Sequence, residues 1–295
     1  MTFFRVPPHI NRSKVVCKGG IELVELIIDD KKDIHNAYAI FVEKFKAKPQ
    51  EIWCEKIDNR IRIHVTENSF SYIRRYIIEA VTEFITKTKE HQLLVQILQD
   101  TYFYEDFEEQ QQILHMYDEI LEGERDDIPG INMTTSKEEL IKNALTPFLQ
   151  EQMTFSLDSF VKFRLKEYKQ RLNFYIQKAI DEYKFEQEYQ MFVEQLRGIV
   201  AAREPLFEHI HIVFNGHFRF FDVTKREITE FMHKWIDRKM LKVYPFCIDL
   251  QVLAPLVSIA PKQIVVYTDN HDHGMIRTIQ NIFLERVSIN HAQYF

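Results

Sequence analysis

The spacing of apolar residues predicts one long helix in the middle of the chain, over about 156–200. Aromatic and aliphatic residues recur there at intervals of three or four, which is the helical period and places them on one face. About forty residues pass without a proline. We expect this stripe to be buried: Phe160, Phe163, Tyr168, Leu172, Tyr175, Ala179, Tyr183, Tyr189, Phe192 and Leu196.

Shorter patterns predict a small β-α-β-β unit at the N-terminal end. An aliphatic run over 21–28 is typical of a strand, and helical spacing follows over 29–48. The runs 51–57 and 60–65 flank the turn signal Asp58-Asn59 and predict a hairpin.

Helical periodicity continues through the next hundred residues. Helices are expected over 69–99 and 103–121, the second with Phe107 facing inward and Gly123 as its stop. The spacing from Thr135 to Glu138 is that of a capping box, which begins a further helix that ends near Pro147.

After Pro205 the pattern changes to alternation. The runs 209–214 and 217–223 are separated by Asn215-Gly216, which favours a type I′ hairpin with positive φ at both central residues. A helix is expected over 224–239, a buried strand over 263–268 and a closing helix over 275–287.

These elements predict an α+β fold that is predominantly helical. It consists of a small N-terminal β-α-β-β unit, a helical middle with the long helix, and a C-terminal unit with the hairpin and a further strand. The polar loop at 123–135 suggests a division into regions 1–122 and 136–295, although a single domain is also compatible with the pattern.

Composition excludes several classes of protein. Seven glycines in 295 residues are about 2%, against a usage of about 7% in typical proteins, and they form no phosphate-binding glycine motif. Cys17, Cys54 and Cys247 are scattered, so reduced thiols in a reducing compartment are expected.

No apolar run approaches the length of a membrane span. We therefore expect a cytoplasmic protein, and the net charge of −6 gives no global attraction to nucleic acid.

Histidines suggest one candidate site. His209 and His211 alternate on one face of their strand, while His271 and His273 lie in a loop with acids. A metal-dependent enzyme using these four histidines is one alternative, and a half-exposed strand face beside a polar loop is the other. We assign no metal and no cofactor to this pattern.

Basic residues suggest a second candidate. The segment 224–242 has a net charge of about +3 by count. A nucleic-acid-binding regulator using this segment as a basic helix is one alternative, but an ordinary amphipathic helix is the favoured explanation, so we expect no nucleic-acid partner. The basic residues are Lys225, Arg226, Lys234, Arg238, Lys239 and Lys242.

The long helix also has a concentration of acids. Asp181 and Glu188 share a face, as do Glu182 and Glu186. Lys178 and Lys184 lie four residues before two of these acids, so local ion pairs are available. Neither this cluster nor any other part of the sequence matches a recognised catalytic motif.

The stretch from Ser159 to Pro205 and the strand after it resemble the YtxC-like putative sporulation family. The most specific elements are Phe160, Phe163-Arg164-Leu165, Tyr168, Ala179, Asp181-Glu182-Tyr183, Glu186, Glu188-Tyr189, Phe192, Glu204-Pro205 and His211. The resemblance implies a cytosolic protein of endospore-forming bacteria that is linked to sporulation. It implies no cofactor and no catalytic residue.

We therefore expect a sporulation-associated interaction or regulatory protein, more plausibly without enzymatic activity, that has a protein partner. The candidate polar interaction surface consists of Arg164, Asp181, Glu182, Glu186, Glu188, Tyr189, Glu204 and His211.

Overall fold

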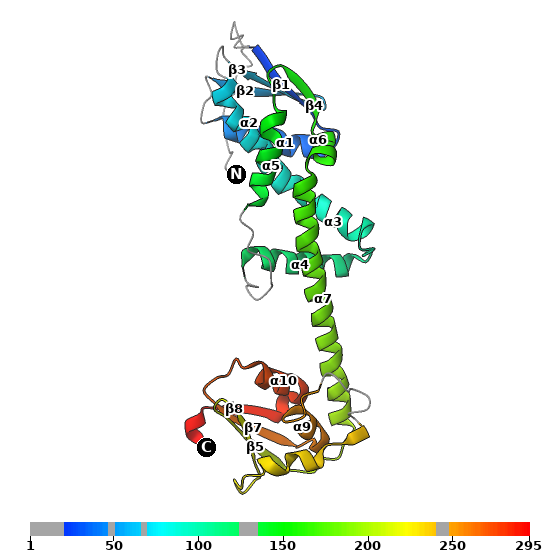
Figure 1. Cartoon of the computed structure of the whole chain (residues 1–295), viewed down its shortest axis with the longest axis vertical. Coiled ribbons are helices and arrows are strands. Elements are labelled where there is room, and N and C mark those ends of the chain that lie inside the picture. Colours follow the sequence, from blue (N-terminus) through cyan, green and yellow to red (C-terminus); the bar gives the residue numbers. More distant parts are fainter. Residues whose placement is uncertain (1–20, 47–50, 66–69, 124–134, 240–247) are drawn as a thin grey trace, which may run out of the picture. The chain divides into compact units, whose positions relative to one another are not determined.

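The structure, a computed structural model, describes residues 21–46, 51–65, 70–123, 135–239 and 248–295. The chain forms two compact units, Met1–Glu182 and Tyr183–Phe295 (Figure 1). Their division falls inside the longest helix, α7 (Lys166–Ala201). The loop at 123–135, where a division was expected, does not separate these units, and residues 124–134 lie outside the described part of the chain.

The N-terminal unit contains a four-stranded sheet in the order β2-β3-β1-β4. β1 (Ile21–Ile27) pairs antiparallel with β3 (Arg60–Val65), which forms the predicted hairpin with β2 (Ile52–Ile57). β4 (Met153–Ser156) pairs parallel with β1. The pattern did not predict β4, because its four residues stand just before the long helical stretch and its partner is more than a hundred residues away.

One face of this sheet is apolar and forms the core. Val24 and Leu26 of β1 lie opposite Ile63 and Ile61 of β3, and all four are buried. The helices α1 (Lys31–Phe45) and α2 (Phe70–Phe84) lie on the same side of the sheet (Figure 1). Asp30 begins α1 by accepting hydrogen bonds from the backbone N–H groups of Lys32 and Asp33.

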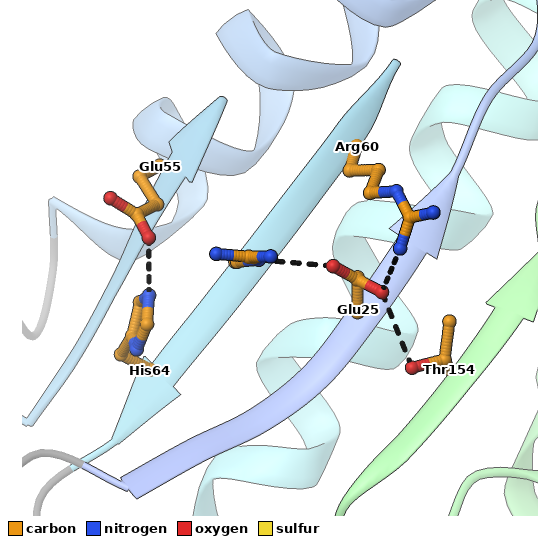
Figure 2. A network of polar contacts seen from close by, with 6 residues as sticks. Glu25, Glu55, Arg60, His64 and Thr154 are labelled. Carbon is orange, nitrogen blue, oxygen red and sulfur yellow. Dashed lines mark hydrogen bonds and ion pairs between the residues drawn. The ribbon is translucent and has the colours of Figure 1, made fainter. Parts of the chain in front are cut away.

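The other face has polar side chains. Glu25 accepts hydrogen bonds from Arg60 Nη1 at 2.7 Å and Arg62 Nε at 3.0 Å, and Figure 2 shows it between Arg60 and Thr154. The hydrogen bond with Arg62, then that with Arg60, lowers the pKa of Glu25 below its ordinary value. The two arginines therefore favour the charged form of this carboxylate on the polar face of the sheet.

The helix expected over 69–99 is interrupted by a π-helical turn. α2 is followed by η1 (Ile85–Lys89), a π-helix, and then by α3 (Glu90–Asp100). Thr86 Oγ1 donates to the carbonyls of Thr82 and Glu83 at the start of this turn. The wider turn changes the rotation of the helix, and the consecutive charged residues Lys89 and Glu90 are both buried.

Two further helices complete this part of the chain. α4 (Phe107–Glu122) ends at Gly123 in the left-handed conformation, as predicted. α5 (Lys137–Phe148) has its capping box at Ser136 and Glu139, one residue later than the predicted pair. The prediction that Phe107 faces inward was wrong: it is the first residue of α4 and is 70% exposed.

The long helix predicted over about 156–200 is present as α7, and it begins later than expected. A short helix, α6 (Leu157–Arg164), precedes it, and Leu165 leaves the helical conformation at φ −93° and ψ 44°. Most of the predicted stripe is buried, but Phe163 is 70% exposed. α7 is continuous across residues 184–187, which lie between its acidic residues Glu182 and Glu188.

The C-terminal unit contains a second sheet in the order β6-β5-β7-β8. β5 (His209–Phe214), β7 (Gln263–Thr268) and β8 (Val287–Asn290) are parallel, and β6 (Phe218–Phe221) pairs antiparallel with β5. Alternate residues of β5 share one core with the end of α7 and with α9 (Leu253–Ile259) and α10 (Gly274–Phe283). Short 3-10 helices η3 (Leu284–Arg286) and η4 (Ala292–Tyr294) flank β8.

Two predictions in this unit were wrong. Phe214 pairs with Phe218, so the hairpin has a three-residue turn in which Gly216 has φ 92° and Asn215 is not left-handed. This is not the type I′ turn expected. In place of the basic helix expected over 224–239, the chain forms a 3-10 helix, η2 (Thr229–Trp235). Residues 240–242 lie outside the described residues.

No helix in the described parts of the chain combines the length and apolar character needed to cross a membrane.

Candidate functional site: a basic groove beside an exposed phenylalanine

A groove lies where α6 meets α7 in the N-terminal unit. The break at Leu165 separates the two helices, and the hollow between their side chains has a volume of about 690 Å³. Three lysines line it, and no acid is present among its described lining residues. The lining consists of Lys162, Phe163, Lys166, Lys169, Gln170, Asn173, Phe174 and Gln177. We call this surface the basic groove.

Helical spacing explains how α7 contributes most of this lining. Lys166, Lys169 and Asn173 lie three or four residues apart, so they share one face of the helix. From α6, Phe163 contributes an aromatic ring of which 70% is exposed, with Lys162 Nζ 5.5 Å from its centroid. The groove therefore combines positive charge with accessible apolar surface.

The break itself is stabilised by a lysine of the groove. Lys169 Nζ donates to the backbone carbonyl of Lys162 at 2.7 Å. In an uninterrupted helix that carbonyl would accept from the backbone N–H four residues later. Cationic side chains near the last turn of α6 also interact favourably with its dipole. The lysines thus help to hold the geometry that brings Phe163 beside α7.

The first turn of α6 is anchored by an ion triad in which Lys89 and Asp33 are buried and Asp158 is partly exposed. Lys89 Nζ lies 2.5 Å from Asp33 Oδ2 on α1 and 2.7 Å from Asp158 Oδ1 on α6. Burial by itself would lower the pKa of Lys89, but hydrogen bonds to Asp158 and Asp33 outweigh it and the pKa is raised. A hollow of about 390 Å³ beside this triad shares Lys162 and Lys169 with the basic groove.

The start of α7 is anchored by a second buried carboxylate, Glu90. It accepts hydrogen bonds from Tyr168 at 2.5 Å, Tyr117 at 2.9 Å and Lys137 at 2.5 Å. Burial first, and then the charge of Glu90, raises the pKa of both tyrosines, so both hydroxyls remain donors at neutral pH. Side chains of four helices, α3, α4, α5 and α7, therefore meet at this carboxylate.

Sequence reasoning did not select these anchoring charges. In the pattern, Lys89-Glu90 looks like a solvated pair inside an amphipathic helix. Only the π-turn, which depends on tertiary packing, turns both side chains inward. A signal that was available is the pair of tyrosines, because buried tyrosine hydroxyls require partners.

The predicted polar surface has members in both units, and most of them are exposed. Arg164 lies over the Phe148 ring at 5.6 Å, Asp181 is 4.0 Å from Lys178, and Glu186 accepts from Gln190. Glu182 is half-buried, and Glu188 and Glu204 are exposed.

Within the C-terminal unit, the two remaining members of that surface have different neighbours. Tyr189 Oη makes hydrogen bonds with Thr278 at 3.3 Å and Asn281 at 3.0 Å, both on α10. His211 lies on the opposite face of the sheet, where its Nδ1 is 3.3 Å from Tyr267 Oη. The structure therefore does not bring Tyr189 and His211 together.

The four histidines considered for a metal are also separated. His209 pairs with Gln263 at the start of β7, whereas His271 and His273 follow its end. His273 caps α10, and His271 stacks edge-on against His291. Within the described ranges, no group of three histidine, cysteine or acidic side chains is placed to hold a metal. Among the predicted thiols, the structure describes Cys54, and burial raises its pKa to about 12.

The fold and the groove define a two-unit α+β protein with a basic, aromatic surface at a helix junction. The family model described as the YtxC-like family matches residues 75–288, and the chain belongs to this family. It is 37% identical to the protein named "Uncharacterized protein YtxC" of Bacillus subtilis (strain 168) over 267 residues. This alignment covers 90% of this chain and 94% of that protein. No solved structure matches the chain. The basic groove lies inside the matched range.

Proposed function

We propose that this protein is a non-enzymatic interaction protein of the cytosol that acts during sporulation. Its basic groove binds an acidic segment of a partner protein. The link to sporulation rests on what the resemblance in the sequence implies, and the partner chemistry is supported by the composition of the groove. The proposal assigns the partner surface to the groove residues of α6 and α7, and the acids of α7 remain the alternative that the variants below test.

The exposed ring of Phe163 is the observation that carries the proposal. A helix face that served only the core would bury this position, as it buries Phe160 and Leu165. An aromatic ring exposed beside lysines offers apolar area that a partner would remove from water on binding. Phe163 also belongs to the segment through which the sequence resembles the family.

Charge determines the kind of partner. The protein has a net charge of −6, yet the described lining of the groove has three lysines and no acid. A segment with carboxylates around one apolar side chain would meet the ammonium groups with its acids. Its apolar side chain would cover Phe163 or Phe174.

The expected affinity is moderate. Exposed ion pairs contribute about 0.2–1 kcal/mol each, and burying one aromatic side chain contributes about 2 kcal/mol. After the loss of translational freedom, such a contact gives transient, salt-sensitive binding. This suits a regulatory partner better than a permanent subunit.

Capture of partners from sporulating cells tests the proposal. Lys162→Glu with Lys166→Glu reverses the charge of the groove and leaves Lys169, which stabilises the helix break. Lys32→Glu with Lys142→Glu makes the same change of net charge at exposed positions of α1 and α5. The groove variant should lose a partner that the control variant retains, and that partner should contact the groove through an acidic segment.

A third variant tests the acidic surface predicted from the sequence. Glu186→Ala with Glu188→Ala removes two exposed carboxylates of α7 and should retain the partner. Loss of the partner in this variant, with retention in the groove variant, would overturn the proposal. Capture of RNA or DNA through the groove, seen as a nuclease-sensitive gel shift, would also contradict it.

A further inference from the structure

A third hollow, of about 480 Å³, lies within the C-terminal unit beside the carboxyl ends of β5 and β7. It is lined by His217, which follows β5, by His233 of η2 and by His273, which precedes α10. In sheets with parallel strands, the carboxyl ends are where connecting loops commonly form binding sites. The volume falls in the range typical of small-molecule sites.

Part of the wall of this hollow is apolar and belongs to the core of the C-terminal unit. Phe214, Phe220, Met232 and Val252 line it and are all buried members of the core of this unit. The rings of Phe214 and Phe218 lie 4.5 Å apart between centroids. The apolar part of the site is therefore preformed, and it suits a flat or aliphatic molecular body.

The polar groups around the hollow are hydrogen-bond donors or neutral. No lysine, arginine, aspartate or glutamate is present among the described lining residues. His217 and His233 are exposed at its edge, and Gln251 contributes an amide. An anionic group there would meet no carboxylate of the described lining residues, and a ring N–H of each imidazole could donate to it.

One of the three imidazoles has a defined tautomer. His273 Nδ1 accepts the backbone N–H of Met275 at 3.3 Å, so in the neutral ring the proton is on Nε2. The ring packs against Phe214 at 4.4 Å and Phe218 at 5.6 Å between centroids. His273 therefore has an N–H donor on its remaining nitrogen, which can donate to an acceptor on a ligand.

We propose that this hollow, the histidine pocket, binds a small organic anion whose apolar body contacts the phenylalanines and whose carboxylate or phosphate is held by His217, His233 and His273. A metal is not the ligand that the geometry favours, because the described residues present no group of three side chains placed to hold one. The proposal is independent of the basic groove, which lies in the other unit.

Isothermal titration with defined probes tests this site in the full-length protein. The probes are phenyl phosphate, benzoate, inorganic phosphate and uncharged benzyl alcohol. Phenyl phosphate or benzoate should bind at least about tenfold more tightly than both benzyl alcohol and inorganic phosphate. Comparing the affinities of phenyl phosphate and benzoate distinguishes a phosphate ligand from a carboxylate ligand.

A histidine variant and a matched control complete the test. His217→Gln with His233→Gln changes two exposed side chains, so the fold should be retained, which circular dichroism checks. This variant should bind the preferred probe about tenfold more weakly, whereas His115→Gln, an exposed histidine of α4, should bind it as the unmodified protein does. Equal binding of benzyl alcohol, unchanged binding in the double variant, or no binding of any probe at about 10 mM would overturn the proposal.

Discussion

At the scale of single residues, the N-terminal unit depends on two consecutive buried charges. Lys89 pairs with acids of α1 and α6, and Glu90 accepts hydrogen bonds from two tyrosines and a lysine. Buried charges are tolerated only when such partners are present. Replacing either one would leave several polar groups without their partners.

Glu90→Leu should therefore destabilise the protein by about 3 kcal/mol, because Tyr117, Tyr168 and Lys137 lose their common acceptor. Urea denaturation of the full-length variant measures the change. Asp118→Asn, at an exposed position of α4, is the matched control and should change stability by less than about 0.5 kcal/mol. A loss below about 1 kcal/mol for Glu90→Leu would show that the carboxylate is not the centre of this network.

His211 makes the C-terminal unit sensitive to mild acid. Burial, and then the positive charge of Lys225, holds the pKa of His211 below its ordinary value of 6.5. The folded state thus favours the neutral ring, so this contribution to stability is present above pH 6.5 and is lost as the pH falls towards the folded pKa.

His211→Gln should reduce the fall in melting temperature between about pH 7.5 and 5.5. Glu25 does not interfere, because its lowered pKa makes its own contribution fall only below its ordinary value of 4.5. If the variant and the unmodified protein lose the same stability over this range, His211 is not the responsible group.

At the scale of elements, two glycines provide a matched test of backbone conformation. Gly216 turns the β5–β6 hairpin at φ 92°, whereas Gly198 lies inside α7. A Cβ added at either position meets no atom within 4 Å. Any difference between their alanine variants therefore comes from the backbone and not from packing.

Gly216→Ala should cost about 1 kcal/mol, because an L residue is strained at this φ. Gly198→Ala should stabilise the protein by about 0.5–1 kcal/mol, because alanine favours a helix. Thermal unfolding of both variants measures the two signs. Two changes of the same sign would contradict the assigned conformations.

The elements that the sequence predicted are those determined by local signals. The hairpin strands show alternation, Gly123 is a helix stop, and the strand at 263–268 is a short apolar run; all three are present. Elements that depend on distant contacts were missed. β4 exists because it pairs with β1, and the π-turn at Ile85–Lys89 is accompanied by partners for Lys89 on α1 and α6.

At the scale of the whole molecule, the sequence predicted the long helix α7. It did not predict the basic groove, the surface that we propose as a site. Phe163 fits the period of the buried stripe, and its exposure follows from the break at Leu165, which no proline or glycine signals. The lysines of the groove are ordinary in the sequence and become a group only when α6 and α7 meet. The acids of α7 were visible because they are close together in the chain.

The measurement that tests the central claim most directly is site-specific photo-crosslinking in sporulating cells. A benzophenone amino acid replaces Phe163 in the full-length protein. The control replaces Phe107 on α4, which is also 70% exposed. Salt at about 0.5 M before irradiation of an extract should reduce an adduct that depends on the lysines.

We predict a discrete protein adduct at position 163, with the crosslink mapped by mass spectrometry to a segment rich in aspartate and glutamate, and no such adduct at position 107. No adduct at 163, the same adducts at both positions, or a crosslink to a basic segment or to nucleic acid would contradict the account of the basic groove.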